Sequence, residues 1–133
     1  MSMTDPVADL LTRIRNAAKA KKPAVDIPAS GLKREIVKIL KEQKFVRDFI
    51  DLPDNKQGIL RVYLRYASGD VSVIKGIKRI STPGLRKTWD ATQVRQSTFG
   101  HTGIAILSTS SGIMTNFEAT KKRIGGEIML RCW

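Results

Sequence analysis

Apolar residues near the start of the chain recur at helical spacing. Between residues 7 and 18 they fall three or four positions apart, as on one buried helix face, and they are Val7, Leu10, Leu11, Ile14, Ala17 and Ala18. The preceding Thr4-Asp5-Pro6 offers a capping side chain and a proline whose missing N–H is not needed in the first turn. The pattern predicts a helix that turns Arg13, Arg15 and Lys19 toward solvent or a partner.

A short strand and a second helix are predicted next. Val25 and Ile27 alternate with a polar residue before a proline, which is typical of a strand. Ser30 is a helix-capping residue. It precedes an apolar stripe made of Leu32, Ile36, Ile39 and Leu40.

A hairpin completes the first half of the chain. Residues 45–52 and 59–66 are β-rich, and the turn-forming segment 53–58 between them favours antiparallel pairing. Residues 1–68 are therefore predicted to form an N-terminal α/β module in the order α-β-α-β-β.

The second half begins after a small polar connection. Residues 71–80 indicate a strand, although the spacing of Val73, Ile74 and Ile77 also fits a helix, and both interpretations stay open. The segment 81–84 is a turn signal because it contains Pro-Gly, and it brings Arg86 just beyond the turn.

A short helix and a final strand are predicted at the end. The segment 115–118 fits a capping box and favours a helix through Ile124, which Gly125-Gly126 would end. Residues 127–133 alternate as a strand. The predicted fold class is α+β with two small modules, the second being a β-rich module with a short helix at residues 69–133.

Composition adds a strong positive charge to this picture. The chain has 133 residues, 41% of them hydrophobic, with a formal net charge of +12 and a pI of about 10.3. Two blocks, residues 10–25 and 71–89, each hold five basic residues and no acid. Each block alone is equally consistent with a solvated surface, but together they favour a nucleic acid as the partner. Without an apolar run of roughly 20 residues or a signal-peptide pattern, we expect a soluble intracellular protein.

Cysteine and histidine usage excludes several kinds of site. Cys132 and His101 are single in the sequence, so neither an internal disulfide nor a standard zinc site is expected, and no cofactor is predicted. A thiol dyad of these two residues is the remaining enzymatic alternative, although a half-buried cysteine is the ordinary interpretation. No phosphate-binding glycine loop or nucleophile elbow occurs, so we expect no enzyme.

An uncharged hydroxyl cluster at residues 108–112 lies between the apolar runs 103–107 and 113–114. Serine and threonine hydroxyls both donate and accept, so they suit base edges, phosphates and ribose 2′-hydroxyls of a folded RNA. The alternative is a serine-rich hairpin turn with no further role. No helix-turn-helix, zipper, zinc finger or RNA-recognition aromatic motif is present to indicate DNA or another RNA fold.

Four separated motifs give the sequence a family resemblance. They are TDPVADLLTRIRN at residues 4–16, RISTPGLR at 79–86, STSSGIMT at 108–115 and GGE at 125–127. In this order they resemble bacterial small-subunit ribosomal protein number eight, over nearly the whole chain. The resemblance implies a two-module, non-catalytic protein in the small ribosomal subunit that binds central-domain rRNA during assembly. It also implies a cytoplasmic location, with an organellar ribosome as the alternative, and ribosomal proteins five and twelve as neighbours.

The same resemblance implies an RNA-binding surface, mainly on the C-terminal module. Its candidate residues there are Ser108, Thr109, Ser110, Gly112, Glu127, Pro83, Gly84 and Arg86. Weaker candidates for backbone contacts on the N-terminal module are Thr4, Arg13, Arg15 and Lys33.

Three positions depart from the family pattern. Thr88 stands where an aromatic is common, and the adjacent Trp89 would point to the opposite face of a strand, so no stacking role is transferred to it. Gly31 lacks a frequent basic side chain, and His101 lies in a more polar segment than usual. A free-standing nucleic-acid-binding regulator remains the alternative function.

Overall fold

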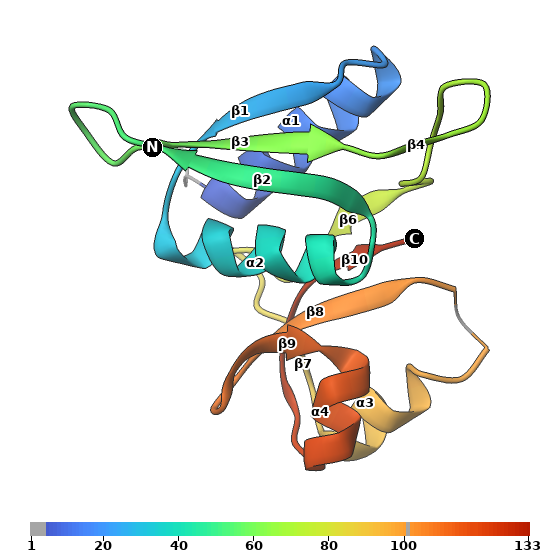
Figure 1. Ribbon diagram of the computed structural model, residues 1–133. Helices are drawn as coiled ribbons and strands as arrows, with labels where there is room; N and C mark the ends of the chain where they lie inside the picture. The colour runs from blue at the N-terminus through green and yellow to red at the C-terminus, as the bar shows by residue number, and fades with distance from the viewer. Residues whose placement is uncertain (1–4, 101) are drawn as a thin grey trace. The chain divides into compact units, whose positions relative to one another are not determined.

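The computed structural model describes residues 5–100 and 102–133, which pack as two compact units (Figure 1). The N-terminal unit is Val7–Lys75, and the C-terminal unit joins residues 5–6 to Gly76–Trp133. The first part of the chain carries two long helices and the second is β-rich, which confirms the predicted α+β class. The module boundary predicted between residues 68 and 69 stays a prediction.

The N-terminal unit follows the predicted order of elements through its third strand, but the strand predicted over 59–66 is divided into two, and one more short strand follows. Its strands β1, β3 and β2 form one antiparallel sheet in that order, and β4 and β5 form a separate small ladder. The elements are α1 (Pro6–Lys19), β1 (Ala24–Pro28), α2 (Gly31–Glu42), β2 (Val46–Leu52), β3 (Ile59–Leu64), β4 (Tyr66–Ala67) and β5 (Val71–Ser72).

The core of this unit comes from the predicted apolar stripes with one correction. The Ser30 hydroxyl accepts from the Lys33 backbone N–H at 3.2 Å and so caps α2 as expected. Leu32, predicted to be a core residue, is 39% exposed. The inner position in that first turn is taken by the Lys33 side chain, which is 5% exposed and donates from Nζ to the Pro28 carbonyl at 2.9 Å.

The C-terminal unit is built around the long strand β10. Strand β8 pairs with one edge of β10, while β6 and β7 pair with its other edge, and β9 lies beyond β8. All these pairings are antiparallel. The elements are β6 (Ile77–Arg79), β7 (Thr88–Trp89), α3 (Ala91–Gln96), β8 (Ile104–Thr109), β9 (Gly112–Thr115), α4 (Asn116–Lys122) and β10 (Gly126–Cys132).

The structure decides one interpretation left open for the second half of the sequence, adds a helix and corrects the end of another. Residues 71–80 hold two short strands, β5 and β6, and no helix. Helix α3 was not predicted, although Asp90 and Gln93 form a reciprocal capping box that marks its start. Helix α4 ends at Lys122 with Arg123 as a left-handed cap (φ 56°), so the two following glycines do not terminate it.

Gly125 and Gly126 instead let β10 enter between its neighbours. A Cβ atom on Gly126 would lie 2.5 Å from the Ser108 carbonyl oxygen, and one on Gly125 would lie 2.2 Å from the Trp89 carbonyl oxygen. Both contacts are too short for any side chain. The glycines therefore fix where β7, β10 and β8 approach one another.

Helices α3 and α4 lie next to each other and share one apolar core with the sheet (Figure 1). The core residues are Val94, Ala105, Leu107, Met114, Ala119 and Ile128, with Ile80, Trp89 and Ile124 packed against them. Buried Asn116 links the layers, because its Oδ1 accepts from the Ala105 N–H and its Nδ2 donates to the Ser97 hydroxyl.

Arg79 anchors the start of the chain to this unit. It pairs through Nε with the Asp5 carboxylate at 3.0 Å and donates through Nη1 to the Met129 carbonyl at 2.7 Å. No helix in the described ranges is long and apolar enough to cross a membrane.

Candidate nucleic-acid interface

The hydroxyl cluster forms the closed end of the β8–β9 hairpin. Thr109 pairs with Gly112, and Ser110 and Ser111 form the turn between them. The Thr109 hydroxyl donates to the Gly112 carbonyl at 2.8 Å and accepts from the Ser111 N–H at 3.1 Å. Gly112 has φ +108° although nothing lies within 4 Å of an added Cβ, so the torsion rather than space requires glycine. The tip is therefore a fixed two-residue turn.

The hydroxyls of this hairpin differ in how free they are. The Thr109 hydroxyl already donates its proton to the Gly112 carbonyl within the turn. Ser110 is exposed, and its hydroxyl has no hydrogen-bond partner among the described residues. Ser108 is half-buried in strand β8 rather than in the turn. Ser110 is thus the candidate hydroxyl best placed to bond an external group.

The sheet aligns two candidate side chains, Glu127 and Ser108, in a row that crosses four strands. Glu127 on β10 pairs with Ser108 on β8 and with Thr88 on β7. Ser108 in turn pairs with Ile113 on β9. Cross-strand partners project to the same face, so these four residues form a single row, which we call the Glu127 row.

Glu127 is held by two side chains from the segment that carries the Pro-Gly turn. Its Oε2 accepts from the Ser81 hydroxyl at 2.6 Å and from Arg86 Nη1 at 2.9 Å. Buried Ser81 also accepts from the Lys87 N–H at 3.0 Å. The Ser81 hydrogen bond and the Arg86 guanidinium together lower the pKa of the Glu127 carboxyl, against a desolvation that raises it. Glu127 is therefore ionised at neutral pH.

The Pro83-Gly84 turn projects beyond this network. Thr82 and Leu85 exchange two backbone hydrogen bonds of 3.1 Å, which close the turn around Pro83 and Gly84. Gly84 does not adopt a positive φ. Leu85 is 62% exposed, and the Arg86 side chain is 60% exposed beside the Glu127 carboxylate. The turn therefore presents an apolar side chain and a cation next to the Glu127 row.

Ser81 is a residue of the candidate site that sequence reasoning missed. The sequence marks it only as the first residue of a turn signal, yet it joins Glu127 on β10 to the backbone of Lys87. Its contact spans 46 positions in the chain. No local pattern carries such a signal.

This surface has groups that can bind hydroxyl and amino groups of a ligand as well as its phosphates. Glu127 Oε1 has no hydrogen-bond partner among the described residues and accepts only. A carboxylate repels phosphate but accepts from base amino groups and 2′-hydroxyls. Arg86 supplies the adjacent positive charge, and Ser110 supplies a group that donates and accepts.

Neither residue at 88 or 89 gives this surface an aromatic ring. Trp89 packs against the apolar core, whereas its neighbour Thr88 is exposed on the opposite face. The alternation expected for a strand is therefore confirmed, and Trp89 does not replace the missing aromatic.

The N-terminal candidates are placed separately in their own unit. Arg13 is exposed on α1 and pairs with Asp9 at 2.9 Å, and Arg15 is exposed on another side of the same helix. Lys33 points inward, and burial is the main cause that lowers the pKa of its ammonium group. Thr4 lies outside the described residues. Among the described N-terminal candidates, Arg13 and Arg15 are therefore the two with exposed side chains.

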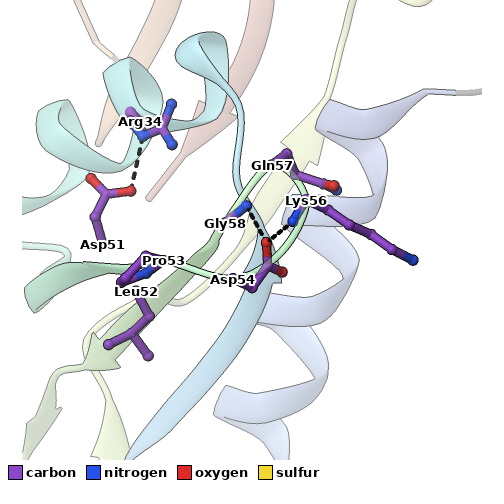
Figure 2. A pocket seen from close by; sticks show the side chains of 8 residues that line it. All are labelled: Arg34, Asp51, Leu52, Pro53, Asp54, Lys56, Gln57 and Gly58. Atoms are coloured by element: carbon purple, nitrogen blue, oxygen red, sulfur yellow. Dashed lines mark hydrogen bonds and ion pairs between the residues drawn. The ribbon is translucent and has the colours of Figure 1, made fainter.

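The β2–β3 hairpin loop borders a hollow whose two carboxylates, Asp51 and Asp54, already have partners. Figure 2 shows Arg34 turned toward Asp51, to which Nε donates at 2.9 Å. Asp54 turns back to accept from the Lys56 and Gly58 backbone N–H groups at 2.7 and 2.8 Å. These contacts stabilise a turn and give no sign of a ligand site.

The described residues also show the state of the cysteine. Cys132 is buried, and burial raises the pKa of its thiol to about 12. It stays protonated at neutral pH and is no nucleophile. His101, its suggested partner, lies outside the described residues. Within residues 5–100 and 102–133, no group of three or more His, Cys, Asp or Glu side chains is arranged to hold a metal ion.

Comparison with known proteins agrees with the motifs. A family model described as "Ribosomal protein S8" matches residues 5–133. The small ribosomal subunit protein uS8 of Ligilactobacillus salivarius is 53% identical over 133 residues, which cover the whole of both chains. The proteins of the same name from Natranaerobius thermophilus and Geobacillus kaustophilus are each 52% identical, also over the full length of both chains.

Proposed function

Since this chain belongs to the ribosomal protein S8 family of the small ribosomal subunit, we propose that it binds central-domain small-subunit rRNA directly and helps to organise its assembly. Family membership makes it a structural protein of the bacterial-type cytoplasmic ribosome and not an enzyme. The proposal concerns the RNA and the residues that contact it.

The Glu127 row and the adjoining hairpin tip are the observation that supports this proposal most. Ser108, Glu127 and Arg86 come from three separate segments: a strand pairing joins Ser108 to Glu127, and a hydrogen bond joins Arg86 to Glu127, which the Ser81 hydroxyl also holds. Such rigidly held polar groups select local RNA geometry, because they meet their partners without reordering.

We assign different roles to the two kinds of side chain. Exposed cations such as Arg13 and Arg15 hold phosphates and supply salt-dependent affinity. Ser110 and the free oxygen of Glu127 contact base edges or 2′-hydroxyls and supply selectivity. Buried Lys33 supports the fold of its unit and is not included among the contacts.

A binding experiment with two matched RNAs tests this division. One RNA is a central-domain hairpin with an irregular internal loop, and the other has that loop replaced by Watson–Crick pairs. For Ser110→Ala and Glu127→Gln we expect affinity for the looped RNA to fall about two- to tenfold, as for one lost hydrogen bond, with little change for the paired RNA.

Arg13→Ala is the comparison for the electrostatic role. It should lower the slope of log affinity against log salt by about 0.7 to 0.9 and leave the ratio between the two RNAs unchanged. Lys121→Gln, on an exposed side chain of α4, is the control for charge alone. The proposal is wrong if Ser110→Ala and Glu127→Gln both keep the full preference for the looped RNA. It is also wrong if duplex DNA competes as well as either RNA.

We also propose small-subunit ribosomal proteins five and twelve as neighbours, on the basis of the family resemblance alone. Crosslinking within assembled subunits, followed by peptide identification, tests this. Crosslinks from this chain to other proteins only would contradict it.

A further inference from the structure

A second cationic surface lies on the sheet face opposite the Glu127 row. Lys78 on β6 and Arg131 on β10 are direct cross-strand partners, so both project to the same face. Arg131 also pairs with Ala105 on β8, three positions from Ser108, the partner of Glu127. On β10 the two residues are four positions apart, but a bulge between Ile128 and Leu130 shifts the register by one, so Arg131 and Glu127 point to opposite faces.

Neither of these two cations is neutralised within the described residues. Like charges directly opposite each other destabilise a strand pair. Arg79, the neighbour of Lys78, pairs with Asp5, and Arg86 pairs with Glu127. By contrast, no carboxylate in the described chain lies within 4.0 Å of the Lys78 or Arg131 charged groups. An external anion would relieve this repulsion.

Trp133 provides a rigid aromatic ring beside the two cations. Its backbone exchanges hydrogen bonds of 2.9 and 3.0 Å with Gly76. A Cβ on Gly76 would lie 2.3 Å from the indole Cζ2, so the ring packs directly on the glycine backbone. A Cβ on Gly103 would lie 2.6 Å from the Trp133 Cβ. The residue nevertheless stays 41% exposed, so a held ring remains open to a stacking partner.

The cations and the ring line one hollow of about 530 Å³, together with Ile80, Gly100 and Thr102. That volume is in the range of sites that hold small ligands. Positive charge beside an aromatic face is the combination by which proteins bind single-stranded nucleic acid without base-specific hydrogen bonds.

We propose that this hollow binds one nucleotide of a single-stranded RNA segment, with its phosphate between Lys78 and Arg131 and its base on the Trp133 indole. The choice of RNA rests on the proposed function, but the site uses none of the residues assigned to it. The chain would then contact two RNA segments, one on each face of the β6-β10-β8-β9 sheet.

Anisotropy of a fluorescein-labelled short oligoadenylate, titrated with the full chain over a salt series, tests the phosphate contacts. Lys78→Gln combined with Arg131→Gln should lower the salt slope by about 0.7 to 1.4, for one or two phosphate contacts on a single strand. Lys121→Gln combined with Lys122→Gln is the matched control, because it removes the same charge from α4 in the same unit. Equal slopes in the two double variants would overturn the proposal.

The stacking contact has its own readout. Trp133→Leu should weaken oligoadenylate binding about fivefold or more, whereas Trp133→Phe keeps a ring and most of the affinity. Wild-type tryptophan emission should fall on titration, and this quenching should be lost in Trp133→Phe. Unchanged binding by Trp133→Leu, or a Trp133→Phe that is as weak as Trp133→Leu, would refute the stacking role.

The same variants separate this inference from the proposed function. A second site is supported if the Lys78, Arg131 and Trp133 variants lose oligoadenylate binding but still bind the looped central-domain hairpin. Oligoadenylate binding that is abolished by Ser110→Ala but unaffected at Lys78, Arg131 and Trp133 would overturn the inference while leaving the proposed function standing. Thermal unfolding by circular dichroism checks that each variant is folded.

Discussion

Gly126→Ala should destabilise the protein and loosen the hairpin that carries the hydroxyls. The new Cβ would lie 2.5 Å from the Ser108 carbonyl oxygen and 2.9 Å from the Thr109 Cγ2. Ordinary contacts begin near 3.4 Å, so β10 and β8 must separate by up to about 1 Å at this point. Overpacking of this kind costs about 1–3 kcal/mol in the free energy of unfolding.

Urea denaturation followed by circular dichroism measures this cost. Gly31→Ala is the matched control, because nothing lies within 4 Å of its added Cβ and it begins helix α2. We expect the control to keep or raise the free energy of unfolding by up to about 1 kcal/mol, since alanine restricts the unfolded chain. Gly126→Ala should also bind the looped RNA about two- to tenfold more weakly, as for one disturbed hydrogen bond. Equal stability of the two variants would refute the close-approach argument.

Three further predictions each concern one residue. Because folding lowers the pKa of Glu127, its stabilising contribution is present above the ordinary value of 4.5 and is lost as the pH falls through the lower folded value. Acid titration of unfolding should therefore be steeper for the wild type than for Glu127→Gln, and parallel curves would contradict this. The Cys132 thiol, with its pKa raised to about 12, should react with a disulfide reagent at pH 8 only on unfolding, and immediate labelling of the folded chain would contradict its burial. Gly112→Ala should lower the free energy of unfolding by about 1–2 kcal/mol relative to Gly31→Ala, because φ +108° is strained for alanine, and unchanged urea midpoints would contradict this.

The order of elements in the N-terminal unit was predictable because its signals are local. Ser30 caps α2 through a residue three positions away, and the β2–β3 hairpin joins neighbouring segments. The Leu32 error has a different origin. A lysine with a long apolar stem competes for the same inner position and finds a carbonyl partner five residues back, at Pro28.

The C-terminal unit was less predictable because long-range contacts decide its details. The two glycines before Glu127 resembled a helix end, but they are required by carbonyl oxygens of Trp89 and Ser108, which are distant in sequence. Helix α3 was missed even though Asp90 and Gln93 carry a recognisable capping box. Its six residues offer too short an apolar pattern to stand out.

The candidate site likewise has a part that local sequence predicts and a part that depends on long-range contacts. The hairpin tip was evident from hydroxyls between two apolar runs, and the structure adds that Thr109 is bonded within the turn while Ser110 is free among the described residues. That Glu127 meets Ser81 and Arg86 depends on strand pairing across more than 40 positions. Such a contact is not encoded in any local spacing.

The most direct test of the central claim is a titration of the isotope-labelled full chain with the looped central-domain RNA hairpin, followed by amide NMR shifts. The account predicts that the Ser108, Ser110 and Glu127 amides shift together and saturate with the same affinity as the bulk binding curve. Shifts confined to other surfaces, such as the exposed face of α4, with these three amides unchanged at saturation would contradict it.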